Sequence, residues 1–307
     1  MILPLCAADF SNYTTSRLRK VKTEADLQSY RATQHPKFLT EARNAACPHI
    51  IISAEHLHGF VRLEQEIGRV RDFLAPLGAR VVVFLYLRRP DDFATSWYAE
   101  RVRTGYAGDL DRLVEHDPLT RHLLDYAGAV DGWASIFGGD NIALRVYDRR
   151  RLHGGNSISD FLHNIGVSED FISQHRSEID SDVRKGLGAD AIAFLVRFNA
   201  RVEKMARPDM RLLAYLRSSA TRELIAQCLE SNESARPFRL SPATRRQLID
   251  RFAESNHKLF ARYGIDGFDD FISDELTNDT ITLETTISFA ASLWLGLQRD
   301  KLANQPR

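Results

Sequence analysis

The sequence predicts an α/β protein with a doubly wound, mainly parallel sheet and a mostly helical C-terminal half. In the first half of the chain, short apolar runs of strand length alternate with amphipathic helical stretches. Such alternation is typical of βαβ units, in which helices join parallel strands. From about residue 157 onward only helical patterns follow. We therefore expect a single domain over residues 1–307, with a sheet portion over 1–156 and a helical portion over 157–307 packed on it.

Three segments are expected to be strands: 49–53 (HIIIS), 79–87 (ARVVVFLYL) and 142–147. The second is apolar at nearly every position. A strand that is apolar on both faces is typical of a parallel sheet covered on both sides.

Helices are expected between and after these strands. Residues 63–74 carry apolar side chains at helical spacing. After Pro90, a helix is expected to begin at Asp91 or Asp92, either of which can cap free backbone N–H groups, and to end near Gly105. Further helical patterns cover 123–137, 158–165, 189–205, 210–230 and 242–263.

Composition excludes several classes of protein. The chain has 307 residues, of which 44% are hydrophobic and 27% charged, so disordered, collagenous and coiled-coil classes are excluded. Its 41 basic and 41 acidic residues balance, which argues against a general nucleic-acid or anionic-membrane binder. The three cysteines are too few and too widely spaced for a disulfide framework, no apolar run is long enough to span a bilayer, and no signal peptide is recognisable. We expect a cytoplasmic protein without a transmembrane segment.

The segment with the most distinctive chemistry is 85–103 (LYLRRPDDFATSWYAERVR). It places Arg88 at the end of the central strand and Ser96 on the helix that follows. Ligands in open α/β sheets bind at the carboxyl ends of strands, where a guanidinium group, a hydroxyl and a helix N-terminus together suit a phosphate. The alternative is an arginine that only solvates a strand end and a serine on a helix surface.

The pattern R–x–P–x–D–x–x–x–S–x–Y in this segment resembles the 3′-phosphate-binding segment of sulfotransferases that use 3′-phosphoadenylyl sulfate. The resemblance extends to IIISAEHL, to DYAGAVDGWASIFGGDNIALRVYDRRRL and SISDFLHNIGV, and to LSPATRRQLIDRFAESNHKLFARYGID, so it covers roughly residues 49–266. These pieces are similar to bacterial, carbohydrate-sulfotransferase-like proteins. The resemblance implies a sheet of the sulfotransferase or P-loop type, with 3′-phosphoadenylyl sulfate as co-substrate and Arg88 and Ser96 holding its 3′-phosphate.

Glu55 and His56 follow the first expected strand and are the candidates for a catalytic base. Sulfuryl transfer needs a group that removes the acceptor's proton, and the resembled family places a Glu or His near strand ends for this purpose. We favour Glu55, with His56 as the substitute. The alternative is an ordinary helix start, in which Ser53 is the cap and Glu55 balances the helix dipole.

The triplet Arg184–Lys185–Gly186 resembles a loop with which cytosolic sulfotransferases also contact the 3′-phosphate. A solvated basic turn is the alternative for such a short match. The histidine spacings do not indicate a zinc site, so we expect no metal.

One element of the resembled family is not recognisable. A glycine- and lysine-containing loop of the type PKTGTT, which holds the 5′-phosphosulfate, is expected near the N-terminus. Here no glycine precedes Gly59 and no lysine precedes Lys20. The loop is either lost or encoded upstream, and the likeness of NYTTSRL to the stretch after that loop favours the second explanation.

The leading hypothesis is therefore transfer of a sulfuryl group from 3′-phosphoadenylyl sulfate to a hydroxyl or amino group of a carbohydrate-like acceptor. The alternative is a non-catalytic nucleotide- or glycan-binding relative without the 5′-phosphosulfate loop. A third reading is another nucleotide-dependent transferase on the same type of sheet. The sequence identifies neither the acceptor nor the oligomeric state.

Overall fold

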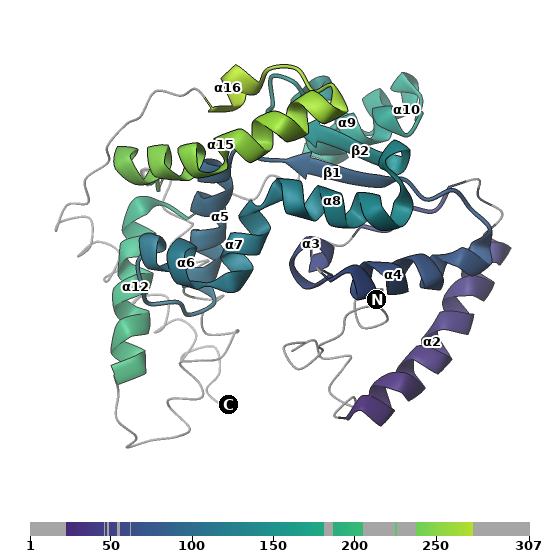
Figure 1. Ribbon diagram of the computed structural model, residues 1–307, viewed down its shortest axis with the longest axis horizontal. Helices are drawn as coiled ribbons and strands as arrows, with labels where there is room; N and C mark the ends of the chain where they lie inside the picture. Colours follow the sequence, from purple (N-terminus) through teal and green to yellow (C-terminus); the bar gives the residue numbers. More distant parts are fainter. Residues whose placement is uncertain are drawn as a thin grey trace, which may run out of the picture. The chain divides into compact units, whose positions relative to one another are not determined.

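The computed structural model describes residues 23–45, 47, 49–53, 56–61, 63–180, 187–204, 225 and 238–272 (Figure 1). The chain divides into two compact units. The first comprises residues 1–87, 121–145 and 261–265, and the second comprises 88–120, 146–260 and 266–307.

The first unit contains most of the described strand residues. Its elements are α2 (Glu24–Asn44), α3 (His56–Phe60), α4 (Glu64–Leu74), the 3₁₀ turns η2 (Ala75–Leu77) and η3 (Gly139–Asn141), β1 (Val83–Leu87), α8 (Tyr126–Phe137) and nearly all of β2 (Ile142–Val146). The helix α7 (Pro118–Leu124) crosses the boundary between the units.

Helix α8 organises the core of this first unit. It packs against both β1 and α4, and Figure 1 shows it running alongside the strands. Its buried face includes Val130 and Trp133. At Gly132 an added Cβ would lie 3.3 Å from Cδ1 of Ile67, a buried residue of α4. The absence of a side chain at Gly132 therefore permits this close approach of the two helices.

The two strands form a parallel sheet. β1 and β2 lie within the expected segments 79–87 and 142–147, although β1 begins only at Val83. The described chain is thus mostly helical with a small parallel sheet, which agrees with the α/β class, whereas the doubly wound order remains a prediction.

The expected strand at 49–53 is wrong. These residues are in no strand, and Ile50 and Ile51 are 45% and 55% exposed. β-Branched residues favour extended backbone, but a strand also needs a neighbour that pairs with its N–H and C=O groups. No described strand pairs with this segment.

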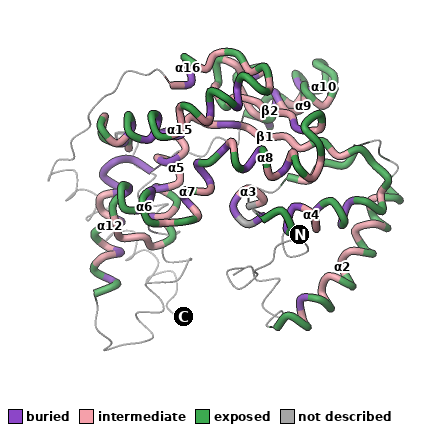
Figure 2. The backbone as a smooth tube through the Cα atoms, viewed as in Figure 1, coloured by how far each residue is buried: buried purple, intermediate pink, exposed green. Residues whose placement is uncertain are grey.

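The described residues of the second unit form helices and the loops between them, apart from the last residue of β2 and an isolated β-bridge at Gly188. Its elements are α5 (Pro90–Arg103), α6 (Leu110–His116), the 3₁₀ turn η4 (His153–Gly155), α9 (Ser157–Asn164), α10 (Glu169–Gln174), α11 (Arg176–Asp180), α12 (Ala189–Lys204), most of α15 (Pro242–Tyr263) and α16 (Phe268–Ile272). The helices expected near 91–105, 158–165, 189–205 and 242–263 are confirmed, whereas the one expected at 210–230 lies outside the described residues apart from residue 225, which is helical. Figure 2 shows buried and exposed positions alternating along α15, as expected for a helix with one covered face.

Helix α5 packs on α6 and α12. At its C-terminal end, the buried side-chain amide of Asn199, on α12, donates hydrogen bonds to the carbonyl oxygens of Val102 (2.8 Å) and Tyr106 (3.0 Å). The last carbonyls of a helix have no partner within it, so Asn199 supplies one from another helix.

None of the described helices has both the length and the apolar character that a bilayer-spanning segment needs.

Candidate functional site

The candidate site lies at the start of α5, in the second unit. Arg88 is the first residue after β1, and Pro90 is the first residue of the helix, where the missing N–H of proline costs nothing. Asp91 and Asp92 follow in the first turn. The helix thus begins one or two residues before the expected start. Arg89, and neither aspartate, occupies the cap position, which carries no side-chain cap hydrogen bond.

Asp91 is engaged in a buried ion-pair network. Its side chain is 1% exposed. One carboxylate oxygen lies 3.2 Å from Nε of Arg89, and the other lies 2.5 Å from Nη2 of Arg245, which is on α15 and 4% exposed. A buried carboxylate is tolerated only with such partners. The network therefore joins the first turn of α5 to the first turns of α15.

Asp92 differs from its neighbour because its side chain is 47% exposed. Partial burial, followed by the negative charge of Asp91, raises its pKa, while Arg88, Arg89 and Arg245 act in the opposite direction. The three guanidinium groups and two carboxylates of this cluster leave a formal charge of +1. The site as a whole therefore favours an anion only modestly.

Arg88 is half-buried, with its guanidinium carbon 5.6 Å from the centre of the Tyr147 ring. A guanidinium group over an aromatic face gains from the ring quadrupole and is held in orientation by it. Tyr147 follows β2 directly and is 38% exposed, so the pair lies at the protein surface.

Ser96 lies on the second turn of α5 and is exposed. It is four residues after Asp92, a spacing that places both side chains on the same face of the helix. Arg88 and Ser96, which the sequence predicts to act together, thus flank the first turn of α5, with Ser96 accessible to a ligand.

The structure does not describe the side chains of the other predicted site residues. Glu55 and the triplet Arg184–Lys185–Gly186 lie outside the described residues. His56 is the first residue of α3, in the first unit, and its side chain is not described.

His58, in the same helix, is a partly buried histidine to which the sequence pattern assigns no role. Burial, together with the nearby His122, lowers the pKa of His58 from 6.5 to about 4. Nε2 of His58 is buried and has no hydrogen-bond partner among the described residues, and Nε2 of His122 lies 2.9 Å from the backbone oxygen of His58. Its position two residues after His56 is the signal that the sequence offers, but the sequence pattern does not predict that His58 is buried.

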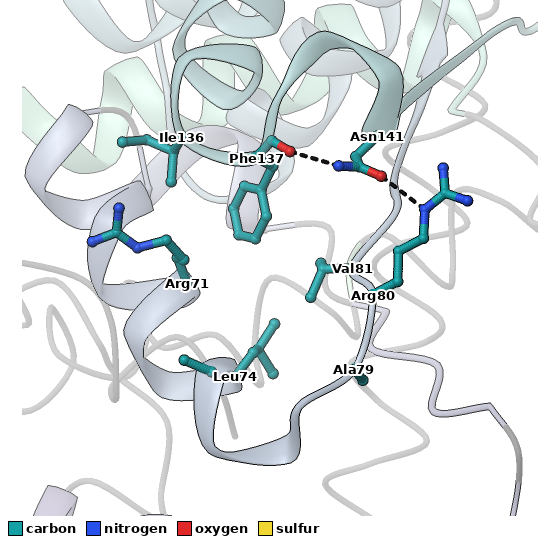
Figure 3. Close-up of a pocket in the computed structure, with 9 residues that line it drawn as sticks. Arg71, Leu74, Ala79, Arg80, Val81, Ile136, Phe137 and Asn141 are labelled. Atoms are coloured by element: carbon teal, nitrogen blue, oxygen red, sulfur yellow. Dashed lines mark hydrogen bonds between the residues drawn. The ribbon is translucent and has the colours of Figure 1, made fainter.

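The first unit contains a surface cavity of about 280 Å³ (Figure 3). Arg80 and Val81, which precede β1, form one wall, and Phe137 and Asn141 form another. Nε of Arg80 donates to Oδ1 of Asn141 (2.9 Å), whose amide donates to the carbonyl of Phe137 (2.8 Å). The cavity lies at the amino end of β1, whereas Arg88 follows its carboxyl end.

One group of metal-ligating side chains converges in the described part of the chain: His153, His163 and Glu169, in the second unit. The sequence predicts no metal site and indicates no role for these residues. Their separation in the sequence does not match a short zinc motif, so only the fold brings them together.

A comparison with known proteins finds a distant relative but no matching family. An uncharacterized protein of Archaeoglobus fulgidus is 26% identical over 215 residues, which cover 70% of this chain and 53% of that protein. The chain thus spans about half the length of this relative. No family model matches the sequence, and no solved structure matches it.

Replacing Asp91 tests the buried network. Asp91→Asn removes the charge that compensates two arginines, one of them almost fully buried, and is expected to lower the free energy of unfolding by about 3 kcal/mol. Asp92→Asn is the matched control: because the Asp92 side chain is half exposed, its loss is expected to cost less than about 1 kcal/mol. Urea denaturation at pH 7 measures both, and equal costs would contradict the assigned role of Asp91.

The lowered pKa of His58 makes stability depend on pH. Between pH 6.5 and about 4 the unfolded chain binds a proton on this side chain and the folded chain does not, so acid favours unfolding. Between pH 6.5 and pH 4, His58 is expected to lower the free energy of unfolding by about 3 kcal/mol. His58→Leu should therefore lose less stability than the parent protein between pH 7 and pH 4.5 in urea denaturation. His116→Leu, at a site 71% exposed, should behave like the parent. The same pH dependence in His58→Leu and the parent would show that His58 does not titrate in this way.

Proposed function

We propose that the protein is a sulfotransferase that moves a sulfuryl group from 3′-phosphoadenylyl sulfate to a hydroxyl or amino group of a carbohydrate-like acceptor. The observation that carries the proposal is the start of α5, where Arg88 and the exposed Ser96 flank the first turn of a helix directly after a parallel strand. This is the arrangement expected of the motif R–x–P–x–D–x–x–x–S.

The chemistry of these groups supports binding of the 3′-phosphate. A guanidinium group donates charge-assisted hydrogen bonds to phosphate oxygens, and a serine hydroxyl donates one more. The N-terminus of α5 adds the positive end of the helix dipole. The ring of Tyr147 orients Arg88, and the network of Asp91, Arg89 and Arg245 holds the turn, so little conformational freedom would be lost on binding.

In the proposed reaction an acceptor oxygen or nitrogen attacks the sulfur atom in line with the leaving group. The new bond to sulfur forms as the bond between sulfur and the 5′-phosphate oxygen breaks, which releases adenosine 3′,5′-bisphosphate. Glu55, or His56 in its place, accepts the acceptor's proton. Most of the rate would come from positioning and charge stabilisation, as in phosphoryl transfer. Arg184, Lys185 and Gly186 are proposed as secondary contacts to the 3′-phosphate on sequence grounds alone.

Calorimetry with adenosine 3′,5′-bisphosphate tests the nucleotide site. Arg88→Ala removes a charged hydrogen-bond donor and is expected to weaken binding by at least ~1.5 kcal/mol, roughly tenfold. Ser96→Ala should weaken it less, because it removes an uncharged donor.

Arg246→Ala is the matched control, since Arg246 is exposed and adjacent to Arg245. It should bind the nucleotide as the parent does, and all variants should keep the parent's melting temperature. If Arg88→Ala bound as tightly as the parent, the proposed nucleotide site would be refuted.

A second candidate function is a non-catalytic nucleotide- or glycan-binding protein. It needs only the phosphate-binding groups at the start of α5, Arg88 and Ser96, and no catalytic base.

A transfer assay with 3′-phosphoadenylyl sulfate and a panel of glycans separates the two functions. The sulfotransferase hypothesis predicts release of adenosine 3′,5′-bisphosphate that depends on the glycan. It also predicts at least a 100-fold lower rate in Glu55→Gln, which removes the base. Nucleotide binding without transfer would favour the binding protein. A full rate in Glu55→Gln would move the role of base to His56, to be tested with His56→Ala.

A further inference from the structure

Three side chains of the second unit converge on one point outside the proposed nucleotide site. Nε2 of His153 lies 2.9 Å from one carboxylate oxygen of Glu169, and Nδ1 of His163 lies 2.7 Å from the other. All three ligand-type atoms are within 4.8 Å of one another. The two imidazole rings are stacked with their centres 4.1 Å apart and their planes inclined by 7°.

The fold positions these groups through three short elements. His153 begins η4, His163 is in the last turn of α9, and Glu169 begins α10. α9 packs against both η4 and α10. The cluster is therefore formed by the tertiary arrangement of residues 153–169 and not by one helix face.

The backbone at His153 is held by buried and charged partners. Its N–H donates to Oδ1 of Asp160 (2.9 Å), a fully buried residue of α9. The next carbonyl, of Gly154, accepts a hydrogen bond from Arg176 (2.7 Å). Gly154 has a φ of +62°, a conformation that glycine adopts without steric cost. These contacts fix the backbone from which the His153 side chain projects.

The charge state of the cluster suits a cation. Glu169 contributes a carboxylate, a group that is ordinarily ionised at neutral pH. Neutral imidazole nitrogen and carboxylate oxygen are ligands that divalent zinc prefers.

Metal binding needs a small change in the distances and a rotation of the imidazole rings, because the in-plane lone pairs of two stacked, nearly parallel rings cannot both point at one ion. Tetrahedral zinc with ligands at about 2.05 Å separates neighbouring ligand atoms by about 3.3 Å. The present separations of 2.7 and 2.9 Å are those of hydrogen bonds, so each would widen by about half an ångström. The His163 and Glu169 side chains are more than half exposed, which allows this movement.

We propose that His153, His163 and Glu169 bind a divalent transition-metal ion of the zinc class, through Nε2, Nδ1 and the carboxylate. The imidazole ligands favour zinc, cobalt or nickel over magnesium and calcium, which prefer oxygen ligands. Three protein ligands at the surface leave a coordination position open to water or to a ligand from solution. The bound ion joins η4, α9 and α10. The proposal does not depend on the proposed sulfotransferase function.

Zinc titration of the EDTA-treated full-length protein by calorimetry tests the site. The parent is expected to bind one equivalent more than the triple variant His153→Ala, His163→Ala, Glu169→Gln. Each single substitution should weaken that equivalent at least tenfold. Glu169→Gln keeps the shape of the side chain, so its effect reports the lost ligand and not a disturbed fold.

His175→Ala is the matched control. His175 stacks on Phe171 beside the cluster but is not one of its ligands, so this variant should bind zinc as the parent does. Melting temperatures without metal verify that the variants are folded. Equal zinc binding by the parent and the triple variant would overturn the proposal.

Cobalt gives an independent measurement. Bound at the cluster, it should produce visible d–d absorption without the near-ultraviolet charge-transfer band of a thiolate ligand, and this absorption should be absent in the triple variant. A thiolate band that persists in the triple variant would place the metal on a cysteine and refute the site.

Discussion

The buried carboxylate of Asp91 is the interaction on which the start of α5 depends. It is removed from water and compensated by guanidinium groups from its own turn and from α15. Because desolvating a charge is costly, the first turn of α5 is stable only where both arginines reach this carboxylate. The positions of Arg88 and Ser96 follow from that turn. The geometry of the proposed nucleotide site is therefore determined by a residue that takes no part in binding.

The same network changes what the basic residues of this region can do. The dipeptide Arg88–Arg89 reads as a pair of anion-binding side chains, but Arg89 is engaged by Asp91, and Arg88 lies over Tyr147. The neighbouring carboxylates reduce the local positive charge further. Recognition of an anion here would therefore depend on the direction of the donors more than on net charge, which agrees with a balanced overall composition.

Features encoded by neighbouring residues could be predicted from the sequence. Helical periodicity predicts α4, α9, α12 and α15, and Pro90 marks the start of α5 to within a residue or two. Contacts between residues that are distant in the sequence could not be predicted from it. Asp91 fits the pattern of a helix cap, and nothing local indicates Arg245 as its partner. His153, His163 and Glu169 lie on three elements whose packing no spacing rule describes. The pattern at 49–53 indicates a propensity for extended backbone. It does not show whether a neighbouring strand is present, and among the described residues none pairs with this segment.

Helix α5 is held at both ends by other helices of its unit. Arg245 of α15 pairs with Asp91 in its first turn. At its C-terminal end, the side-chain amide of Asn199 of α12 donates hydrogen bonds to backbone carbonyl groups. A helix clamped in this way cannot fray from either terminus without breaking a buried polar contact. Its amide hydrogens should therefore exchange with solvent only through larger openings of the unit. A ligand that displaced its first turn would therefore act against the contacts that α5 makes with α15 and α12.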